Sequence, residues 1–306
     1  MIVVFGSINV DLVFEAPALP RAGETVLAPD YRALPGGKGA NQALAARRAG
    51  ALVSMYGCVG RDGFAATALE LLDRDGVDLS GLARSDRATG CAAVCVDPSG
   101  ENQIVVASGA NRDARADDVP DTVLHSDTTV VLQLEVDLGE IAALIARARD
   151  EGARVVLNAA PAAKMPEAAL AALDVLIVNR IEATMLAGAL GSSEPDPVAA
   201  ARWLAERSDC LTVVTLGGDG AVAFGAGEAW GIDALAIEPR DTTGAGDTFA
   251  GVFAAALDDG APVADALAHA SVAAGLACLE IGAQQSIPTA AMIEARLGEL
   301  APARRL

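Results

Sequence analysis

The sequence has 306 residues, of which 52% are hydrophobic, 21% are charged and 3% are aromatic, and its formal net charge at pH 7 is −19. A chain of this length can bury a large core, and one large domain with a smaller one is expected. Such an acidic chain repels nucleic-acid phosphates and anionic membranes, so we expect neither partner. A phosphate-bearing ligand stays possible, because backbone amides and helix ends bind anions at any net charge.

The chain begins with an apolar, strand-like run and shows no basic leader, so we expect no signal peptide and a cytoplasmic location. Its five cysteines include no Cys-x-x-Cys pair, which favours free thiols over disulfides or a metal site. The weakly polar run at 266–279 is too short to span a bilayer.

Strand-like runs alternate with amphipathic helical runs along most of the chain. The predicted strands are 2–5, 52–56, 129–134, 154–157, 175–178 and 211–215. The predicted helices are 36–48, a helix from the N-cap Asp62 to about Gly76, 138–150, 181–189 and 197–207. This alternation predicts an α/β fold with a mainly parallel sheet and helices on both faces.

Two stretches break the alternation. Residues 11–34 contain strands with no helix between them, and 89–108 read as a hairpin around the turn Asp97-Pro-Ser-Gly100. We expect a small β-lid that consists of residues 11–35 and 87–109. The α/β core would then consist of 1–10, 36–86 and 110–306. Ligands of parallel sheets bind beyond the carboxyl ends of the strands, where a lid would exclude water.

The segment Asp241-Thr-Thr-Gly-Ala-Gly-Asp-Thr-Phe249 carries the clearest chemical signal. It follows a strand-like stretch at 234–237 and opens a predicted helix over 244–257. Small residues at a helix start leave N–H groups bare, and these form an anion hole suited to a phosphoryl group. Asp247 in the first turn can accept a hydroxyl proton as the oxygen attacks phosphorus. The alternative is an ordinary glycine turn with a helix-dipole aspartate.

Two further motifs precede that segment. Pro35-Gly-Gly-Lys-Gly-Ala-Asn-Gln42 is not a P-loop, because Gly follows Gly-Lys where a P-loop has Ser or Thr. Its glycines would let a polyol approach the backbone, and Asn41 offers a donor and an acceptor. Asn9 and Asp11 alternate by two at the end of the first strand, so they share a face and suit vicinal hydroxyls. Either motif alone is equally consistent with turn chemistry.

Together, the motifs at 36–42 and 241–249 resemble the two signatures of the ribokinase-like (PfkB) carbohydrate kinase family. The resemblance covers nearly the whole chain, through further stretches at 6–11, 100–104, 108–111, 133–135, 158–161, 179–182, 215–217 and 282–286. It implies a three-layer α/β/α domain with a β-lid and an ATP-dependent phosphotransferase. One departure is Ala159, where many members have Pro, and we do not expect it to alter the chemistry.

The resemblance also implies a role for individual residues. Asp247 would be the catalytic base, and the anion hole would comprise the amides of Gly244, Ala245 and Gly246. The sugar would be held by Asn9, Asp11, Gly37, Lys38, Asn41, Glu135 and Asp247. The residues along the Mg²⁺–ATP complex would be Asn179, Glu182, Thr215, Gly217, Gly220, Gly246 and, near the adenine, Ser271.

A potassium site is implied as well. Its side-chain oxygens would come from Asp241 and Ser286, and its carbonyls from Thr243, Cys278, Ile281 and Gly282. The alternative is that Asp241 caps the helix and Ser286 closes a turn. A homodimer formed through the β-lids is a further expectation from the resemblance.

The resemblance makes D-ribose the leading expected acceptor, with ribose 5-phosphate as the product. Another sugar or a nucleoside (fructose, tagatose or adenosine) is the alternative, although few aromatic residues are available to stack on a nucleobase. Dispersed basic residues in the lid disfavour a phosphorylated sugar. An intact Asp247 disfavours a non-catalytic sugar sensor. Gly6-Ser-Ile-Asn9 lacks the dinucleotide-binding fingerprint, which disfavours a dehydrogenase.

Overall fold

The computed structural model describes residues 1–98 and 101–306. Within them, a ten-stranded sheet forms the centre of the molecule, in the order β14-β13-β12-β11-β10-β9-β8-β1-β4-β5. The parallel strands are β1 (Ile2–Phe5), β4 (Val53–Gly60), β5 (Leu82–Ser85), β8 (Thr129–Gln133), β9 (Arg154–Asn158), β10 (Val175–Asn179) and β11 (Leu211–Thr215). The antiparallel edge comprises β12 (Ala221–Gly225), β13 (Glu228–Ile232) and β14 (Arg304–Arg305).

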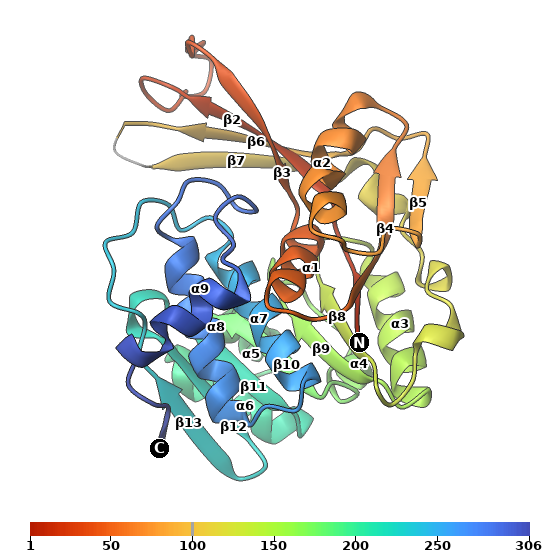
Figure 1. The fold of residues 1–306 in the computed structure, drawn as a ribbon, viewed down its shortest axis with the longest axis vertical. Coiled ribbons are helices and arrows are strands. Elements are labelled where there is room, and N and C mark those ends of the chain that lie inside the picture. Colours follow the sequence, from red (N-terminus) through yellow and green to blue (C-terminus); the bar gives the residue numbers. More distant parts are fainter. Residues whose placement is uncertain (99–100) are drawn as a thin grey trace.

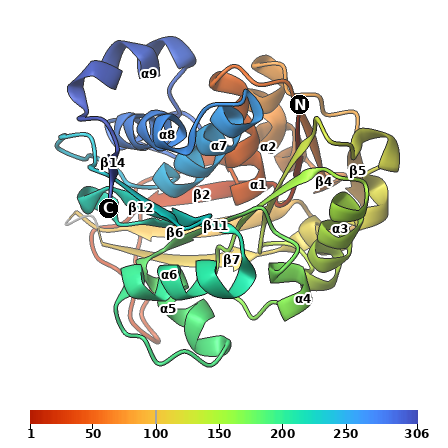
Figure 2. The same ribbon diagram turned by 90° about the horizontal axis from the view of Figure 1, so that it is seen from below.

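Helices cover both faces of this sheet (Figures 1 and 2). On one face lie α1 (Lys38–Arg48), α2 (Gly63–Arg74), α7 (Ala245–Asp258), α8 (Val263–Ala277) and α9 (Ala290–Arg296). On the other lie α3 (Leu138–Asp150), α4 (Glu167–Leu170), α5 (Arg180–Ala189) and α6 (Pro197–Ser208). Alternate residues of β1 enter the two buried clusters, Ile2 and Val4 on one side and Val3 and Phe5 on the other. The predicted three-layer architecture is confirmed.

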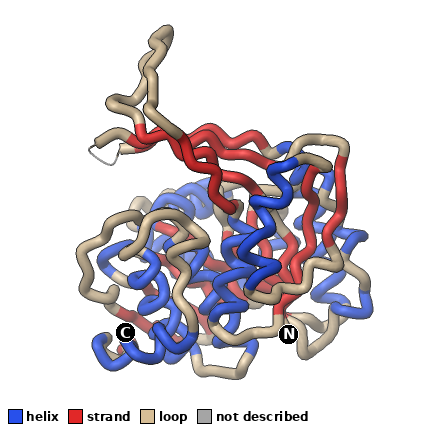
Figure 3. The backbone as a smooth tube through the Cα atoms, turned by 45° about the horizontal axis from the view of Figure 1, so that its top comes forward, coloured by secondary structure: helices blue, strands red, loops and turns tan. Residues whose placement is uncertain are grey.

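A second sheet, called here the lid sheet, projects from the body (Figures 1 and 3). Its order is β3 (Tyr31–Gly36), β2 (Asn9–Glu15), β6 (Gly90–Val96) and β7 (Asn102–Ala107). β2 pairs antiparallel with β3 and parallel with β6, and β6 pairs antiparallel with β7. Of the predicted turn between β6 and β7, Ser99 and Gly100 lie outside the described residues.

Two sequence predictions need correction. The helix predicted from Gly36 begins at Lys38, because Gly36 ends β3 and Gly37, with φ +91°, is the N-cap. The stretch 234–237, predicted as a strand, lies outside the strands of the described chain. The strand beside β13 at the edge of the sheet is β14, from the C-terminal end of the chain. Leu235 packs on α8 so closely that a Cβ added to Gly275 would lie 2.7 Å from its Cβ.

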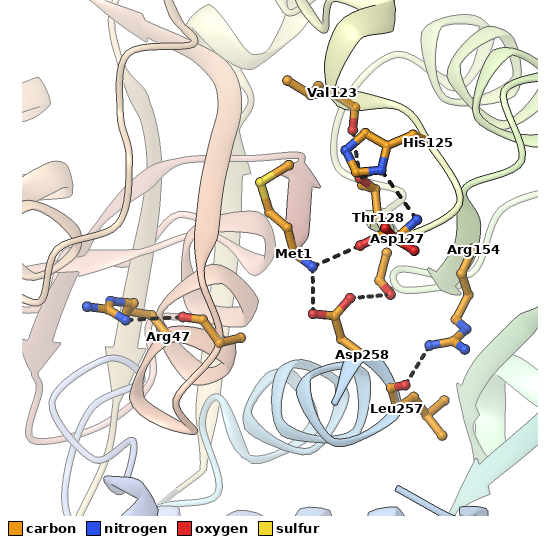
Figure 4. Close-up of polar contacts among 11 residues, drawn as sticks. Met1, Arg47, Val123, His125, Asp127, Thr128, Arg154, Leu257 and Asp258 are labelled. Atoms are coloured by element: carbon orange, nitrogen blue, oxygen red, sulfur yellow. Dashed lines mark hydrogen bonds and ion pairs between the residues drawn. The ribbon is translucent and has the colours of Figure 1, made fainter. Parts of the chain in front are cut away.

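Helix α7 packs between α1 and α8, and its C-terminal end is fixed to the amino ends of three strands. Asp258 accepts a hydrogen bond from the nitrogen of Met1 (2.9 Å), and Arg154 Nη1 donates one to the carbonyl of Leu257 (2.6 Å) (Figure 4). Asp258 also accepts a hydrogen bond from Thr129 Oγ1 (2.8 Å). A helix of 14 residues is roughly 21 Å long, so this anchor fixes its N-terminal end at the carboxyl edge of the sheet. None of the helices in the described ranges is long and apolar enough to cross a membrane.

Candidate active site

A cleft of about 940 Å³ lies between the lid sheet and the carboxyl edge of the main sheet. Asp11, Arg32 and Leu34 line it from the lid sheet, and the loops 239–243 and 281–283 line it from below. In the cross-strand register Asp11 is paired with Leu34, so one face of the lid sheet is turned toward this cleft. The predicted position of a ligand site beneath a lid therefore matches the geometry.

Asp247 lies in the first turn of α7 and is 6% exposed. Its Oδ2 accepts from Asn41 Nδ2 (2.9 Å), and its Oδ1 accepts from Gln42 Nε2 (3.0 Å). The side-chain oxygen of Asn41, Oδ1, is buried and has no hydrogen-bond partner within the described ranges. A buried unpaired acceptor is costly, so this site suits a ligand with hydroxyl donors.

The N-terminal end of α7 presents backbone amides next to that carboxylate. Gly244 is the N-cap, with φ +76°, a left-handed conformation that glycine adopts without strain. The first N–H groups of a helix have no partner within it. Of the three predicted anion-hole amides, that of Ala245 makes a long 3.3 Å bond to the carbonyl of Thr242. The arrangement can stabilise negative charge close to the Asp247 carboxylate.

Several carboxylates surround Lys38. Glu135 Oε2 accepts from Ser7 Oγ (2.6 Å) and from the amide of Lys38 (3.2 Å). The charge of Asp247 raises the pKa of Lys38, although burial opposes it. Burial raises the pKa of Asp11 to about 7, and the charges of Glu135 and Asp247 add to the effect while Lys38 opposes it. Asp11 therefore changes its charge near neutral pH.

Asn9 is buried and has a fixed orientation. Its Oδ1 accepts from Asn111 Nδ2 (2.7 Å), and Asn111 Oδ1 accepts from the amide of Ile8 (2.9 Å). A Cβ added to Gly90 would lie 2.2 Å from Asn9 Oδ1, so this junction of the lid sheet with the core requires glycine. Asn9 and Glu135, both predicted to hold the sugar, line a further pocket of about 750 Å³ instead of the cleft.

A second pocket of about 440 Å³ adjoins the N-terminal end of α7. Its walls are largely apolar, with Leu235, Ile237 and Phe249 among them, and suit a planar base. It brings together the predicted nucleotide residues Thr215, Gly217, Gly220, Gly246 and Ser271. Cys278, predicted for the cation site, also lines it.

Asn179 and Glu182 lie at the N-terminal end of α5 and cap it reciprocally. Asn179 Oδ1 accepts from the amide of Glu182 (2.8 Å), and Glu182 Oε2 accepts from the amide of Asn179 (2.9 Å). Burial raises the pKa of Glu182, while the Asn179 amide and the charge of Lys38 oppose this effect. The pair is held by the helix end, close enough to Lys38 for their charges to interact.

The predicted cation residues lie on two adjoining loops. Asp241 Oδ1 accepts from the amide of Thr243 and Oδ2 from that of Gly282, both at 2.9 Å. The carbonyl of Cys278 accepts from the amide of Asp241 (3.3 Å), and Ser286 Oγ donates to a carbonyl within its own turn (2.9 Å). Burial works to raise the pKa of Asp241, but these amide bonds lower it overall, so the carboxylate is ionised at neutral pH.

Residues 1–290 match the family described as pfkB family carbohydrate kinase. The chain belongs to this family. It is 35% identical over 290 residues to a ribokinase of Haemophilus influenzae, with 94% of each chain covered. The structure of a Thermotoga maritima ribokinase matches with a TM-score of 0.91 at 29% identity, over 97% of this chain and 99% of that chain. An Arabidopsis thaliana ribokinase complexed with ribose and ATP matches with a TM-score of 0.86 at 29% identity, over 97% and 98%.

As a PfkB kinase, the protein is a phosphotransferase that acts on a sugar hydroxyl. The structure brings Asn41, Asp247 and the first turn of α7 together. Thr242, just before this turn, lines both the cleft and the second pocket. Sequence reasoning missed Ser7, Gln42 and Asn111, whose side chains hold the predicted residues Glu135, Asp247 and Asn9. Gln42 ends the quoted glycine motif and Asn111 ends a matching stretch, but neither position indicates what its side chain contacts.

Proposed function

We propose that this PfkB kinase is a ribokinase, which transfers the γ-phosphoryl group of ATP to the 5-hydroxyl of D-ribose and releases ADP. The ribokinases at 35% identity and the ribose–ATP complex of a structural relative support this substrate pair. The observation that carries the proposal is the position of Asp247, whose carboxylate is held by Asn41 and Gln42 beside the first turn of α7. Ribose would occupy the cleft and ATP the second pocket.

In the reaction, the 5-oxygen of ribose forms a bond to the γ-phosphorus as the bond from that phosphorus to the bridging oxygen breaks. The hydroxyl proton passes to the carboxylate of Asp247. The amides of Gly244, Ala245 and Gly246 would stabilise the charge on the phosphoryl oxygens. General base catalysis of this kind contributes about 10²–10⁴-fold to the rate.

Polar residues in and around the cleft would supply donors and acceptors for the sugar hydroxyls. Asn9 would offer its side-chain amide nitrogen, Asn41 its unpaired oxygen, and Asp11 and Glu135 their carboxylates. Gly37 and Lys38 would complete the sugar site through the close backbone approach and the ammonium group. Hydroxyl donors would also relieve the repulsion among the carboxylates.

The family implies magnesium, and the residues fit a loosely held ion. Across residues 1–98 and 101–306 no group of three or more His, Cys, Asp or Glu could hold a metal. Mg²⁺ keeps several waters and binds through one or two carboxylates plus substrate phosphates. We propose that Glu182 and Asn179 contact it through water. When bound, it would neutralise charge on the nucleotide phosphates.

Potassium fits the two loops at the base of α7. Asp241 would supply its carboxylate, Thr243, Cys278, Ile281 and Gly282 their carbonyl oxygens, and Ser286 its hydroxyl oxygen. The Asp241 carboxylate is held by the amides of Thr243 and Gly282, which supports this assignment. A Cβ added to Gly244 would lie 3.0 Å from Ala283, so this loop supports the helix start. We propose that potassium stiffens it. A rate indifferent to replacement of potassium by tetramethylammonium would contradict this.

The lid sheet is the proposed dimer interface. In the sheet register Leu12, Ala33, Ala93 and Val105 form one row across all four strands. This row faces away from the cleft, because the adjacent row contains Asp11 and Leu34. Val105 is 73% exposed, and an apolar sheet face with a free edge favours pairing. Light scattering should give twice the chain mass for the wild type and the monomer mass for Val105→Asp. A monomeric wild type would contradict the proposal.

A coupled assay of ADP release tests the substrate. The acceptors are ribose, deoxyribose, fructose, tagatose, adenosine and fructose 6-phosphate, with ATP, magnesium and potassium present. We expect the highest kcat/KM with ribose. Preference for another acceptor would keep the chemistry and change the substrate. No turnover with any acceptor, together with a ribose-induced rise in melting temperature, would indicate a sugar sensor. The cytoplasmic location stays a prediction.

A further inference from the structure

We propose that Gln42 is a positioning residue for phosphoryl transfer, which holds the carboxylate of Asp247 in place through a chain of buried amides anchored in the sheet. This role rests on the proposed function of Asp247 as the base. None of the roles implied by the family resemblance involves Gln42, whose side chain is fully buried and bonds to Asp247, Asn158 and Gln133.

Every polar atom of the Gln42 side chain is engaged. The residue is 0% exposed. Its Nε2 donates to Asp247 Oδ1 and to Asn158 Oδ1, both at 3.0 Å, and its Oε1 accepts from Gln133 Nε2 at 2.7 Å. Two N–H groups and one carbonyl are thus matched to two acceptors and one donor. A buried amide with every polar atom paired is held in a single orientation. Within the described ranges the Gln133 Oε1 atom next in the chain is buried without a partner, so full pairing holds for Gln42 itself.

The direction of this chain is fixed by its two ends. Asn158 Nδ2 donates to the carbonyl of Ile177 (3.1 Å), a backbone acceptor that cannot change its role. Asn158 Oδ1 must therefore face Gln42. The carboxylate of Asp247 is only an acceptor when ionised. Reversing the Gln42 amide would place its oxygen against two other acceptors, with no donor among the three atoms.

The chain ties the base to the sheet as well as to its own helix. Gln133 and Asn158 are register partners at the carboxyl ends of β8 and β9. The Gln133 side chain packs directly on the backbone of Gly6, just after β1. A Cβ added to Gly6 would lie 1.9 Å from Gln133 Oε1. With Asn41 on Oδ2 and Gln42 on Oδ1, rotation of the Asp247 carboxylate is blocked from both sides. Each oxygen keeps a lone pair for the sugar hydroxyl.

Two substitutions at this position separate positioning from packing. Gln42→Met keeps the length and burial of the side chain and removes its hydrogen bonds. Gln42→Glu keeps its shape and can still accept from Gln133, but the ionised carboxyl repels Asp247. Once protonated, the introduced carboxyl can donate to Asp247 Oδ1 in place of the lost N–H. Only this variant should therefore recover activity as the pH falls.

The measurements are kcat and both KM values from pH 6 to pH 8, with the best acceptor of the panel. For Gln42→Met we expect kcat to fall about 10–100-fold, because a misplaced catalytic group slows the reaction by this order of magnitude. Each KM should stay within about threefold of the wild-type value. For Gln42→Glu, kcat relative to the wild type should rise about fivefold or more between pH 8 and pH 6. Gln42→Met should keep the wild-type shape of the pH profile.

Gln133→Met is the matched control. It deletes a buried amide that contacts Gln42 but not Asp247, and it leaves the bonds of Gln42 to Asp247 and to its second anchor, Asn158, in place. We therefore expect a similar fall in melting temperature and a much smaller fall in kcat. Equal losses of kcat in Gln42→Met and Gln133→Met would reduce Gln42 to a structural role and overturn the proposal. If Gln42→Met does not fold, the pH profile of Gln42→Glu decides: parallel profiles for it and the wild type overturn the proposal.

The wild type and Asp247→Asn are measured alongside. An active wild type with an unaffected Gln42→Met would overturn the role of Gln42 alone. A wild type without kinase activity on any acceptor, or an Asp247→Asn variant with normal turnover, would overturn the proposed function and this role with it.

Discussion

Replacing Asp11 by Asn should stabilise the ligand-free protein while it weakens sugar binding. Asp11 lies on the cleft face of the lid sheet, near Glu135 and Asp247, and its pKa is raised to about 7, first by burial and then by these two charges. Ionised Asp11 is therefore unfavourable in the folded protein. Asn has nearly the same shape and no charge to bury.

The size of the effect follows from the pKa. A rise from 3.8 to about 7 corresponds to about 4 kcal/mol, and water in the open cleft reduces this to about 2–4 kcal/mol. The folded protein keeps a proton on Asp11 between these two pH values that the unfolded chain has released. Its stability therefore falls as the pH rises through this range, and the full cost is present above pH 7.

The assay is thermal unfolding of Asp11→Asn and the wild type without sugar, at pH 6 and pH 8. For a chain of this size about 1.5–2 °C corresponds to 1 kcal/mol, so the melting temperature at pH 8 should rise by about 3–8 °C. The gain should be smaller at pH 6. Asp86→Asn is the control, because it changes the net charge equally and its side chain is fully exposed. An unchanged or lower melting temperature for Asp11→Asn at pH 8, or an equal gain at both pH values, would refute the reasoning.

Two further predictions concern the same site. The KM for ribose should rise about tenfold as the pH falls from 8 to 6. With a pKa of about 7, only about a tenth of the Asp11 side chains stay ionised at pH 6, and a protonated carboxyl cannot accept hydrogen bonds from two hydroxyls. A constant KM would contradict this role. Gly244→Ala should lower kcat about tenfold or more, while sugar binding measured by calorimetry persists. A side chain at φ +76° is strained by about 1–2 kcal/mol and would press on Ala283, 3.0 Å away. A wild-type kcat would show that the helix start tolerates the substitution.

The parallel half of the fold could be predicted because its strands are buried on both faces and read as continuous apolar runs, such as Val175–Val178. The antiparallel edge could not. β14 is only Arg304–Arg305, which carries no strand pattern, and its pairing with β13 depends on the path of the whole C-terminal segment. The stretch at 234–237 has the composition of a strand, but packing on α8 decides its conformation.

The same division holds at the site. Glycines at helix starts were informative because the backbone there requires them: Gly37 and Gly244 both have positive φ. The alternation of Asn9 and Asp11 followed from the period of a strand. The hydrogen bonds of Gln42 could not be predicted, since Gln133, Asn158 and Asp247 reach it from three elements that only the strand order brings together. Motifs identify positions, whereas contacts depend on topology.

The most direct test of the account is the ribose-dependent release of ADP by the wild type and by Asp247→Asn, with ribose binding to both measured by calorimetry. We predict that the variant loses about 10²–10⁴-fold in kcat and that its dissociation constant for ribose changes far less, because the missing carboxylate acts as the base of the reaction. A variant with near-normal turnover would contradict the central claim that Asp247 activates the sugar hydroxyl.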